Sequence, residues 1–145
     1  MTGKVDPMRR FVFWAIVALA VLAVGVPAWA GSPHFVDATV TCTRSGNTLT
    51  CSGKEAGLGD EAQIHIVVSA TAECINPGHH HPKAANKESV SAAGDFPVQN
   101  GKANFSLSVT ASFQPECSPP MTVVFVDVTV TDTTNNISVS FPGPI

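Results

Sequence analysis

Three adjacent histidines, His79 to His81, are the most distinctive candidate for chemistry in this sequence. They lie in a long polar loop between Cys74 and Glu88. In an extended backbone His79 and His81 project to the same side, so their imidazoles could ligate zinc, copper or nickel. A native site needs at least one more ligand, and the spacing of the other donors supplies none. We therefore expect only weak, adventitious metal binding and no resident cofactor.

A second candidate is the proline-rich loop that contains Ser118, Pro119, Pro120 and Met121, directly after Cys117. A rigid, extended loop binds a protease cleft with little loss of entropy. Inhibitors of the subtilisin-inhibitor type carry a Cys-Pro-Met stretch in their reactive loop, which this segment resembles with a serine and an extra proline inserted. The alternatives are an inhibitor loop and a plain connection between strands.

The acidic residues do not form a recognisable catalytic or calcium pattern. Asp60, Glu61, Asp95, Asp127 and Asp132 are expected in turns or on outward faces, where water solvates them, and no Asp-x-Asp-x-Asp loop occurs. The sequence also lacks a Gly-x-Ser-x-Gly elbow, a His-Glu-x-x-His motif and a phosphate-binding glycine loop. These absences indicate that the protein is not an enzyme.

The four cysteines indicate two disulfides, because the chain also carries an export signal. If Gly46-Asn47 is a two-residue hairpin turn, Cys42 faces Cys51 in a close, non-hydrogen-bonded pair. Cys74 and Cys117 then form the second bridge. Zinc is the rival interpretation, but the spacings lack the close cysteine pairs of zinc knuckles.

Strand alternation with a period of two runs from Val36 to Phe141, and no stretch keeps helical spacing. The expected inward faces consist of the apolar residues in each alternating run. They are Val36, Ala38, Val40 and Cys42, then Leu49 and Cys51, then Ile64, Ile66, Val68, Ala70 and Ala72, then Phe105, Leu107, Val109, Ala111 and Phe113, then Val124, Val126, Val128 and Val130, and finally Ile137, Val139 and Phe141.

A second hairpin is predicted at Asn100-Gly101, the most favoured two-residue turn. It would pair Gln99 with Lys102 and Phe96 with Phe105. Together these strands predict an all-β domain, an immunoglobulin-like two-sheet sandwich of about seven strands with two disulfides.

The first 30 residues have the pattern of a secretory signal peptide. Basic residues precede an apolar run from Phe11 to Val26, and Pro27 is followed by Ala28-Trp29-Ala30, the small-x-small pattern of a cleavage site. An uncleaved anchor helix is the alternative, since the segment from Phe11 to Ala30 is about 20 residues long and could span a bilayer. We expect residues 1–30 to be removed as a helical signal peptide and residues 31–145 to be a secreted, extracellular domain without stable membrane association.

The composition of that domain argues against some classes of partner. The chain is 145 residues long with 13% charged residues, far below the usual quarter or so. Beyond residue 30 the sequence has five basic against ten acidic residues, which argues against nucleic acid as a partner. It also has no Trp or Tyr there, so stacking platforms for sugars or bases are absent. An extracellular protein or a small-molecule ligand remains as the partner.

The run from Leu49 to Asp60, the Cys74-Ile-Asn-Pro-Gly78 stretch and Asn100 to Ala103 resemble small secreted actinobacterial proteins of unknown function. That resemblance implies no activity. In size, export and disulfide number the chain is distantly similar to apoproteins of the neocarzinostatin type, which implies an immunoglobulin-like sandwich with a ligand cleft. Its disulfide spacing departs from theirs, because Cys74 and Cys117 are far apart.

The exported form is expected to begin at Gly31, because the cleavage pattern ends at Ala30. Such a protein contains no Trp or Tyr and absorbs almost no light at 280 nm beyond its disulfides. Mass spectrometry of the culture supernatant measures the start of the chain. Recovery from the membrane fraction with Trp14 and Trp29 still present would support the anchor helix instead.

Overall fold

A computed structural model of the chain describes residues 31–78 and 86–145. The predicted signal peptide and the three histidines lie outside the described residues. The described part contains eight strands and one short 3-10 helix. In chain order they are β1 (His34–Phe35), η2 (Asp37–Thr39), β2 (Thr41–Ser45), β3 (Thr48–Ala56), β4 (Gln63–Ile75), β5 (Lys87–Pro97), β6 (Lys102–Thr110), β7 (Thr122–Asp132) and β8 (Ile137–Phe141).

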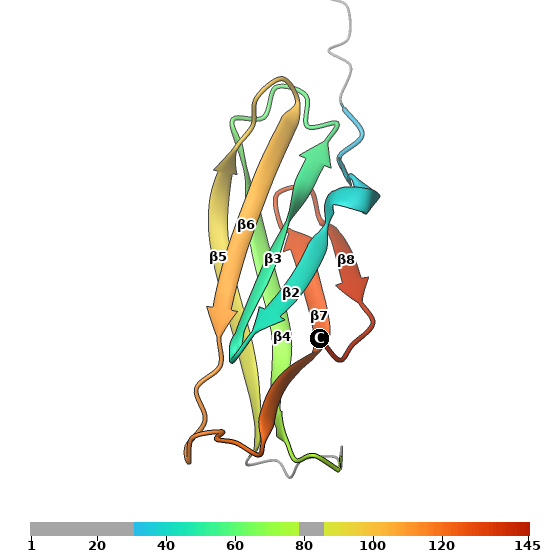
Figure 1. Cartoon of the computed structure of the whole chain (residues 1–145). Helices are drawn as coiled ribbons and strands as arrows, with labels where there is room; N and C mark the ends of the chain where they lie inside the picture. The colour runs from blue at the N-terminus through green and yellow to red at the C-terminus, as the bar shows by residue number, and fades with distance from the viewer. Residues whose placement is uncertain (1–30, 79–85) are drawn as a thin grey trace, which may run out of the picture.

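The strands form two antiparallel four-stranded sheets packed face to face (Figure 1). In the first sheet, β3 is central: it pairs with β6 along one edge and with β1 and β2 in succession along the other. The second sheet has the order β5-β4-β7-β8. The predicted all-β, two-sheet sandwich with two disulfides is therefore confirmed.

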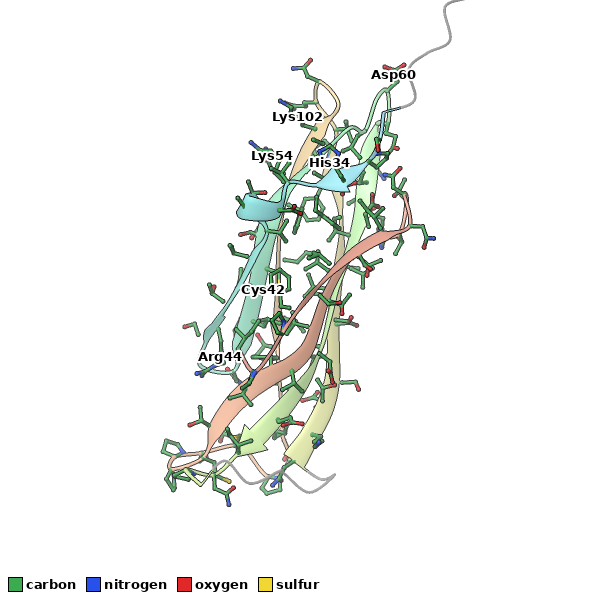
Figure 2. The ribbon with its side chains drawn as sticks, turned by 90° about the vertical axis from the view of Figure 1, so that its right-hand side faces the viewer. His34, Cys42, Arg44, Lys54, Asp60 and Lys102 are labelled. Carbon is green, nitrogen blue, oxygen red and sulfur yellow. A yellow bond between two sulfur atoms is a disulfide. The ribbon has the colours of Figure 1, made fainter. Side chains whose placement is uncertain are left out.

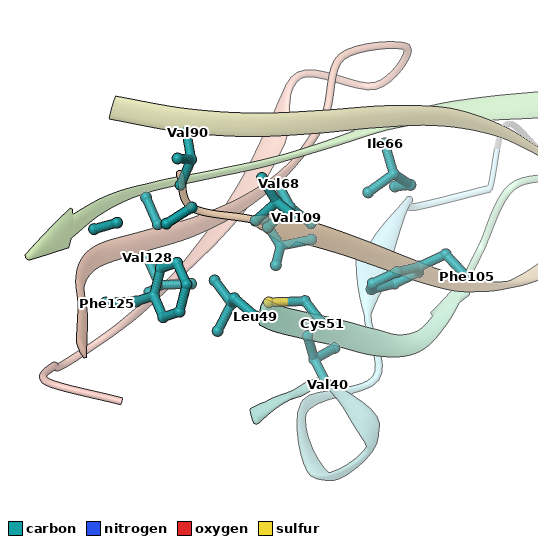
Figure 3. Packing of buried hydrophobic residues seen from close by; sticks show 14 of the residues in the cluster. Val40, Leu49, Cys51, Ile66, Val68, Val90, Phe105, Val109, Phe125 and Val128 are labelled. Atoms are coloured by element: carbon teal, nitrogen blue, oxygen red, sulfur yellow. The ribbon is translucent and has the colours of Figure 1, made fainter. Parts of the chain in front are cut away.

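The core lies between the sheets, where apolar residues from alternate strand positions meet (Figure 3). On β4 the alternation is regular, so Ile64, Ile66 and Val68 are fully buried, as predicted. Leu49 and Cys51 of β3 face them from the other sheet, and Figure 3 shows the Cys51 sulfur inside this apolar layer. Burying such residues stabilises a fold by about 1.5–3 kcal/mol each.

Both predicted disulfides are present. The turn at Gly46-Asn47 places Cys42 opposite Cys51 in the ladder of β2 and β3, with a Cα–Cα distance of 4.1 Å. Cys74, near the end of β4, is bonded to Cys117 in the connection between β6 and β7. The hairpin register counted from the sequence is thus confirmed residue by residue.

The second predicted hairpin is wrong in its strands, although its turn is real. Gln99 and Lys102 exchange two backbone hydrogen bonds of 2.8 and 3.1 Å, but β5 and β6 then separate into different sheets. Each finds a longer partner, because β5 pairs eleven residues with β4 and β6 pairs nine with β3. Phe96 and Phe105 meet across the core instead, edge to face, with ring centroids 6.2 Å apart.

The predicted strand from Val36 to Cys42 is interrupted by the helix η2. The backbone N–H of Thr39 donates to the Val36 carbonyl at 2.8 Å, which closes a turn where the alternation predicted a strand. The Thr39 hydroxyl oxygen then accepts the N–H of Lys54 on β3 at 3.1 Å. Local side-chain bonding of this kind competes with strand pairing, so the chain enters the sheet in two pieces, β1 and β2.

A β-bulge reverses the alternation of β7. Asp127, with φ 53°, and Val128 together face one position of β4, because Ser69 pairs with Thr129 while Thr71 pairs with Val126. An extra residue inverts which side chains point inward. The inward positions before the bulge are Val123 and Phe125, and those after it are Val128 and Val130. The prediction was therefore right for Val128 and Val130 and wrong for Val124 and Val126.

The outer face of the first sheet is built from hydroxyl side chains. Three rows of Thr and Ser cross β2, β3 and β6 in register, and they are Thr41-Ser52-Ser106, Thr43-Thr50-Ser108 and Ser45-Thr48-Thr110. Neighbouring hydroxyls bond each other, at 2.8 Å between Thr48 and Thr110 and at 2.7 Å between Thr50 and Ser108. These three rows are polar without charge, and the charged side chains of this face, Lys54 and Lys102, lie beyond them toward the other end of the strands.

Removing the longer-range disulfide should cost more stability than removing the hairpin disulfide. The chain-entropy relation assigns about 4 kcal/mol to the bridge with sequence separation 43 and about 3 kcal/mol to the bridge with separation 9. Urea unfolding of the Cys74→Ala/Cys117→Ala and Cys42→Ala/Cys51→Ala variants measures both. A larger loss from the hairpin variant would show that buried Cys51 contributes mainly through core packing.

Candidate functional site

A cleft of about 700 Å³ opens at one end of the sandwich, between the β2–β3 hairpin turn and the connection from β6 to β7. This volume falls within the range of small-molecule sites. The floor is apolar, with Phe113 and Val123 nearly buried, and the rim is polar. The complete lining is Arg44, Gly46, Asn47, Thr110, Ala111, Ser112, Phe113, Gln114, Glu116, Cys117, Met121, Thr122 and Val123.

The walls of the cleft are held by bonds between distant parts of the chain. The side-chain amide of Asn47 donates to the Ala111 carbonyl at 2.9 Å, and the Ala111 N–H donates to the Asn47 carbonyl at 2.9 Å. The backbone N–H of Ser112 donates to Glu88 of β5 at 2.9 Å. The Cys74–Cys117 disulfide anchors the far part of the loop. The cleft is therefore a preformed feature on rigid strands.

Charge at the rim comes from two exposed residues of opposite sign, Arg44 and Glu116. Figure 2 shows Arg44 toward the end of the sandwich opposite His34 and Asp60. Across the part of the chain that the structure describes, the Arg44 guanidinium makes one long contact, with the Gly46 carbonyl at 3.4 Å. A guanidinium has five N–H donors, so Arg44 can still bind an acidic group that enters the cleft.

Of the predicted inhibitor segment, Met121 lines this cleft, together with the preceding Cys117. Ser118, Pro119 and Pro120 are exposed, while Met121 is half-buried with its sulfur 3.8 Å from Cys74 Sγ. The Met121 N–H donates to the Ser118 carbonyl at 3.0 Å, so the segment is folded as a turn. His79 and His81 lie outside the described residues, and their weak metal binding stays a prediction.

Most of the acidic residues singled out from the sequence are at the surface. His65 Nδ1 contacts Asp95 Oδ1 at 2.7 Å on the outer face of the second sheet. Asp60 is exposed in a loop and Asp127 is exposed at the bulge. Asp132 is the exception: it is fully buried, against the expectation of a solvated position. The bulge and the register of β7 direct it into the interior.

Sequence reasoning also missed the partner of Asp132, Glu55 of β3, which is fully buried. The signal was the period of two, because Glu55 lies on the same face of β3 as the predicted inward residues Leu49 and Cys51. Neither carboxyl oxygen of Glu55 has a hydrogen-bond donor among the described residues. Burial and the nearby Asp132 and Glu61 carboxyl groups raise the pKa of Glu55 to about 8. A buried carboxyl group that keeps its proton at neutral pH is the result.

Comparisons with known proteins do not assign a family. The chain matches no protein-family model, no curated protein and no solved structure. Within residues 31–78 and 86–145, no helix is long and apolar enough to cross a membrane. The same residues bring together no group of three or more His, Cys, Asp or Glu side chains suited to hold a metal ion. The function has to be inferred from the cleft and the fold.

Glu55→Gln should raise the stability of the domain at pH 8 and make it less dependent on pH. The raised pKa means that the folded protein keeps a proton which the unfolded chain releases near pH 4.5. This contribution is complete below pH 4.5 and is lost as the pH rises toward 8, by at most about 1.4 kcal/mol per pH unit. Gln carries an N–H donor in place of that proton and does not titrate.

Urea unfolding at pH 5, 6.5 and 8 measures this difference between the parent protein and the variant. Asp127→Asn is the matched control, because it neutralises an exposed carboxylate outside the core. A parent protein that loses no stability relative to Glu55→Gln between pH 5 and pH 8 would contradict a protonated Glu55.

Proposed function

We propose that this chain is a secreted, non-enzymatic binding module whose ligand is a small amphipathic acid held in the cleft at the disulfide-bonded end. The observation that carries the proposal is the combination of an apolar floor, formed by Phe113 and Val123, with Arg44 at the rim. An apolar body would be buried against the floor while its acidic group meets the guanidinium.

Preorganisation supports this proposal. Asn47, Ser112 and Cys117 are each fixed by bonds to other strands or loops, so little ordering is needed when a ligand binds. The scaffold contributes rigidity and the connecting segments contribute the contacts, which is the usual division of labour in sandwich domains. Two disulfides agree with an oxidising, extracellular environment.

We also infer that the sandwich is immunoglobulin-like. One sheet contains β1, β2, β3 and β6, and the other contains β4, β5, β7 and β8. The chain therefore crosses between the two sheets several times, which is typical of that architecture. The distant similarity to neocarzinostatin-type apoproteins implies the same arrangement and a ligand cleft. The resemblance to small secreted actinobacterial proteins stays an expectation from the sequence.

Protease inhibition is the less favoured alternative. A protease cleft accepts an extended segment, whereas the hydrogen bond between Met121 and Ser118 folds this loop into a turn. The half-buried Met121 side chain also faces the cleft and the disulfide. Met121 is therefore better explained as part of the wall of the ligand site.

An amphipathic fluorescent sulfonate, 1-anilinonaphthalene-8-sulfonate, should bind the folded protein saturably with one site per chain. Arg44→Gln should weaken its binding by about tenfold, because one charge-assisted hydrogen bond contributes about 1.5 kcal/mol. Ser112→Trp should abolish binding by filling the cleft from its rim. Fluorescence titration measures each dissociation constant, and competition by medium-chain fatty acids extends the test to natural acids.

Lys54→Gln is the matched control, since Lys54 carries the same charge but lies outside the cleft lining. Its dissociation constant should equal that of the parent protein. Equal binding by the Arg44→Gln and Lys54→Gln variants, or no saturable binding by the parent protein, would overturn the proposed site.

A further inference from the structure

Glu55 and Asp132 approach each other from opposite sheets at the end of the sandwich away from the cleft. Glu55 belongs to β3, where it pairs with Phe35 of β1 on one side and with Ala103 of β6 on the other. Asp132 is the last residue of β7. Both side chains are fully buried, the Glu55 oxygens have no hydrogen-bond partner among the described residues, and the nearby Asp132 carboxyl group is one cause of the raised pKa of Glu55.

Asp132 already accepts hydrogen bonds on both of its oxygens. Its Oδ1 accepts the backbone N–H of Thr134 at 2.8 Å, and its Oδ2 accepts the Asn135 amide at 2.7 Å. The same Asn135 nitrogen donates to Glu61 at 3.0 Å. Both Asp132 oxygens thus act as acceptors, and a hydrogen bond from Glu55 to Asp132 requires a proton on Glu55, since two carboxylates are both acceptors.

The other charged groups around Glu55 do not replace that proton. Glu61, from the β3–β4 loop, is a further carboxylate facing the pair. Lys54 on β3 and Lys102 at the start of β6 are the neighbouring basic residues, and both are exposed on the outer side of the sheet. From β1 the group facing Glu55 is the buried, apolar Phe35.

A bound cation fits this arrangement less well than a proton. The Asn135 amide nitrogen already lies between the Asp132 and Glu61 carboxylates, where a shared cation would have to sit. An amide nitrogen is a donor and does not ligate calcium. The observed hydrogen bonds therefore describe a site that holds a proton.

We propose that the Glu55–Asp132 carboxyl pair is a pH-operated latch, which holds β1 and the β7–β8 turn closed while it shares a proton and opens this end of the sandwich when the proton is lost. Ionised Glu55 and Asp132 would repel each other in a buried environment without a facing cation. Movement of Glu55 toward water relieves that repulsion.

The first element to separate should be β1. Its ladder has only two residue pairs, His34 with Ala56 and Phe35 with Glu55 itself, and one further bond joins the Val36 N–H to the Lys54 carbonyl at 2.9 Å. In contrast, β4 is paired along most of its length on both sides. Local openings of low free energy occur where pairing is shortest. The latch would thus control release of the N-terminal strand without unfolding the sandwich.

Amide hydrogen exchange of the purified protein, read by mass spectrometry and corrected for intrinsic rates, tests the latch between pH 6 and pH 9. Protection of peptides covering residues 33–36, 54–58 and 132–136 should fall by up to about tenfold per pH unit between pH 6 and pH 8 and level off above pH 8, where Glu55 is ionised in the closed state as well. Peptides covering residues 66–72 of β4 should keep their protection. In Glu55→Gln all of these peptides should be independent of pH, whereas Asp127→Asn should behave as the parent protein does.

A second measurement needs no variant. Titration of the side-chain carboxyl carbons of labelled Glu by NMR should show one group that ionises well above the others in the folded protein. The latch is overturned if no such group exists, if protection is independent of pH in the parent protein, or if all peptides lose protection together. Restored protection at pH 9 on adding calcium chloride would also overturn it, in favour of a metal site.

Discussion

The register of strand β3 controls most of what distinguishes this molecule. β3 pairs with β1 and β2 along one edge and with β6 along the other, so its side chains are fixed on both sides. With this register Leu49 and Cys51 enter the core, the Thr and Ser residues between them face solvent, and Glu55 is directed inward. A slip of one residue would reverse all three and separate Cys51 from Cys42.

Because the chain has few charged residues, hydroxyl side chains supply much of its polar surface. Thr and Ser favour the extended backbone or tolerate it, and paired across strands they satisfy one another, as Thr50 and Ser108 do. Such a surface gives solubility without ion pairs, whose contribution at an exposed position is small in any case. The two disulfides then add stability that surface charge does not provide.

The two ends of the sandwich have opposite characters. At one end, a loop anchored by Cys117 and the Asn47 turn leave a cleft with an apolar floor, which suits a ligand. At the other end, the Glu55–Asp132 pair and the bridging Asn135 fill the space between the sheets with polar groups. Buried carboxyl groups contribute less stability than apolar residues of the same size would. Their presence at one end only fits a regulatory role better than a structural one.

The sequence by itself determined the features that depend on neighbouring residues. Alternation predicted the all-β class and the inward face of β4, and the Gly46-Asn47 turn predicted the Cys42–Cys51 pairing, because turn geometry and a period of two are local. By elimination, the second disulfide followed from the first. The sequence also indicates the proline-rich loop after Cys117 as a candidate site, but it does not predict the cleft beside that loop.

Tertiary structure decided what depends on partners distant in the chain. The Asn100-Gly101 turn did not join two strands of one sheet. Instead β5 forms a long ladder with β4, and β6 forms a long ladder with β3. The bulge at Asp127 inverts the inward and outward faces of one half of β7. It arises from the pairing of β7 with β4, which is distant in the chain and which no local sequence pattern indicates. The burial of Glu55 and Asp132 arises for the same reason: each lies in its own strand, and only the packing of the two sheets brings the carboxyl groups together, away from water.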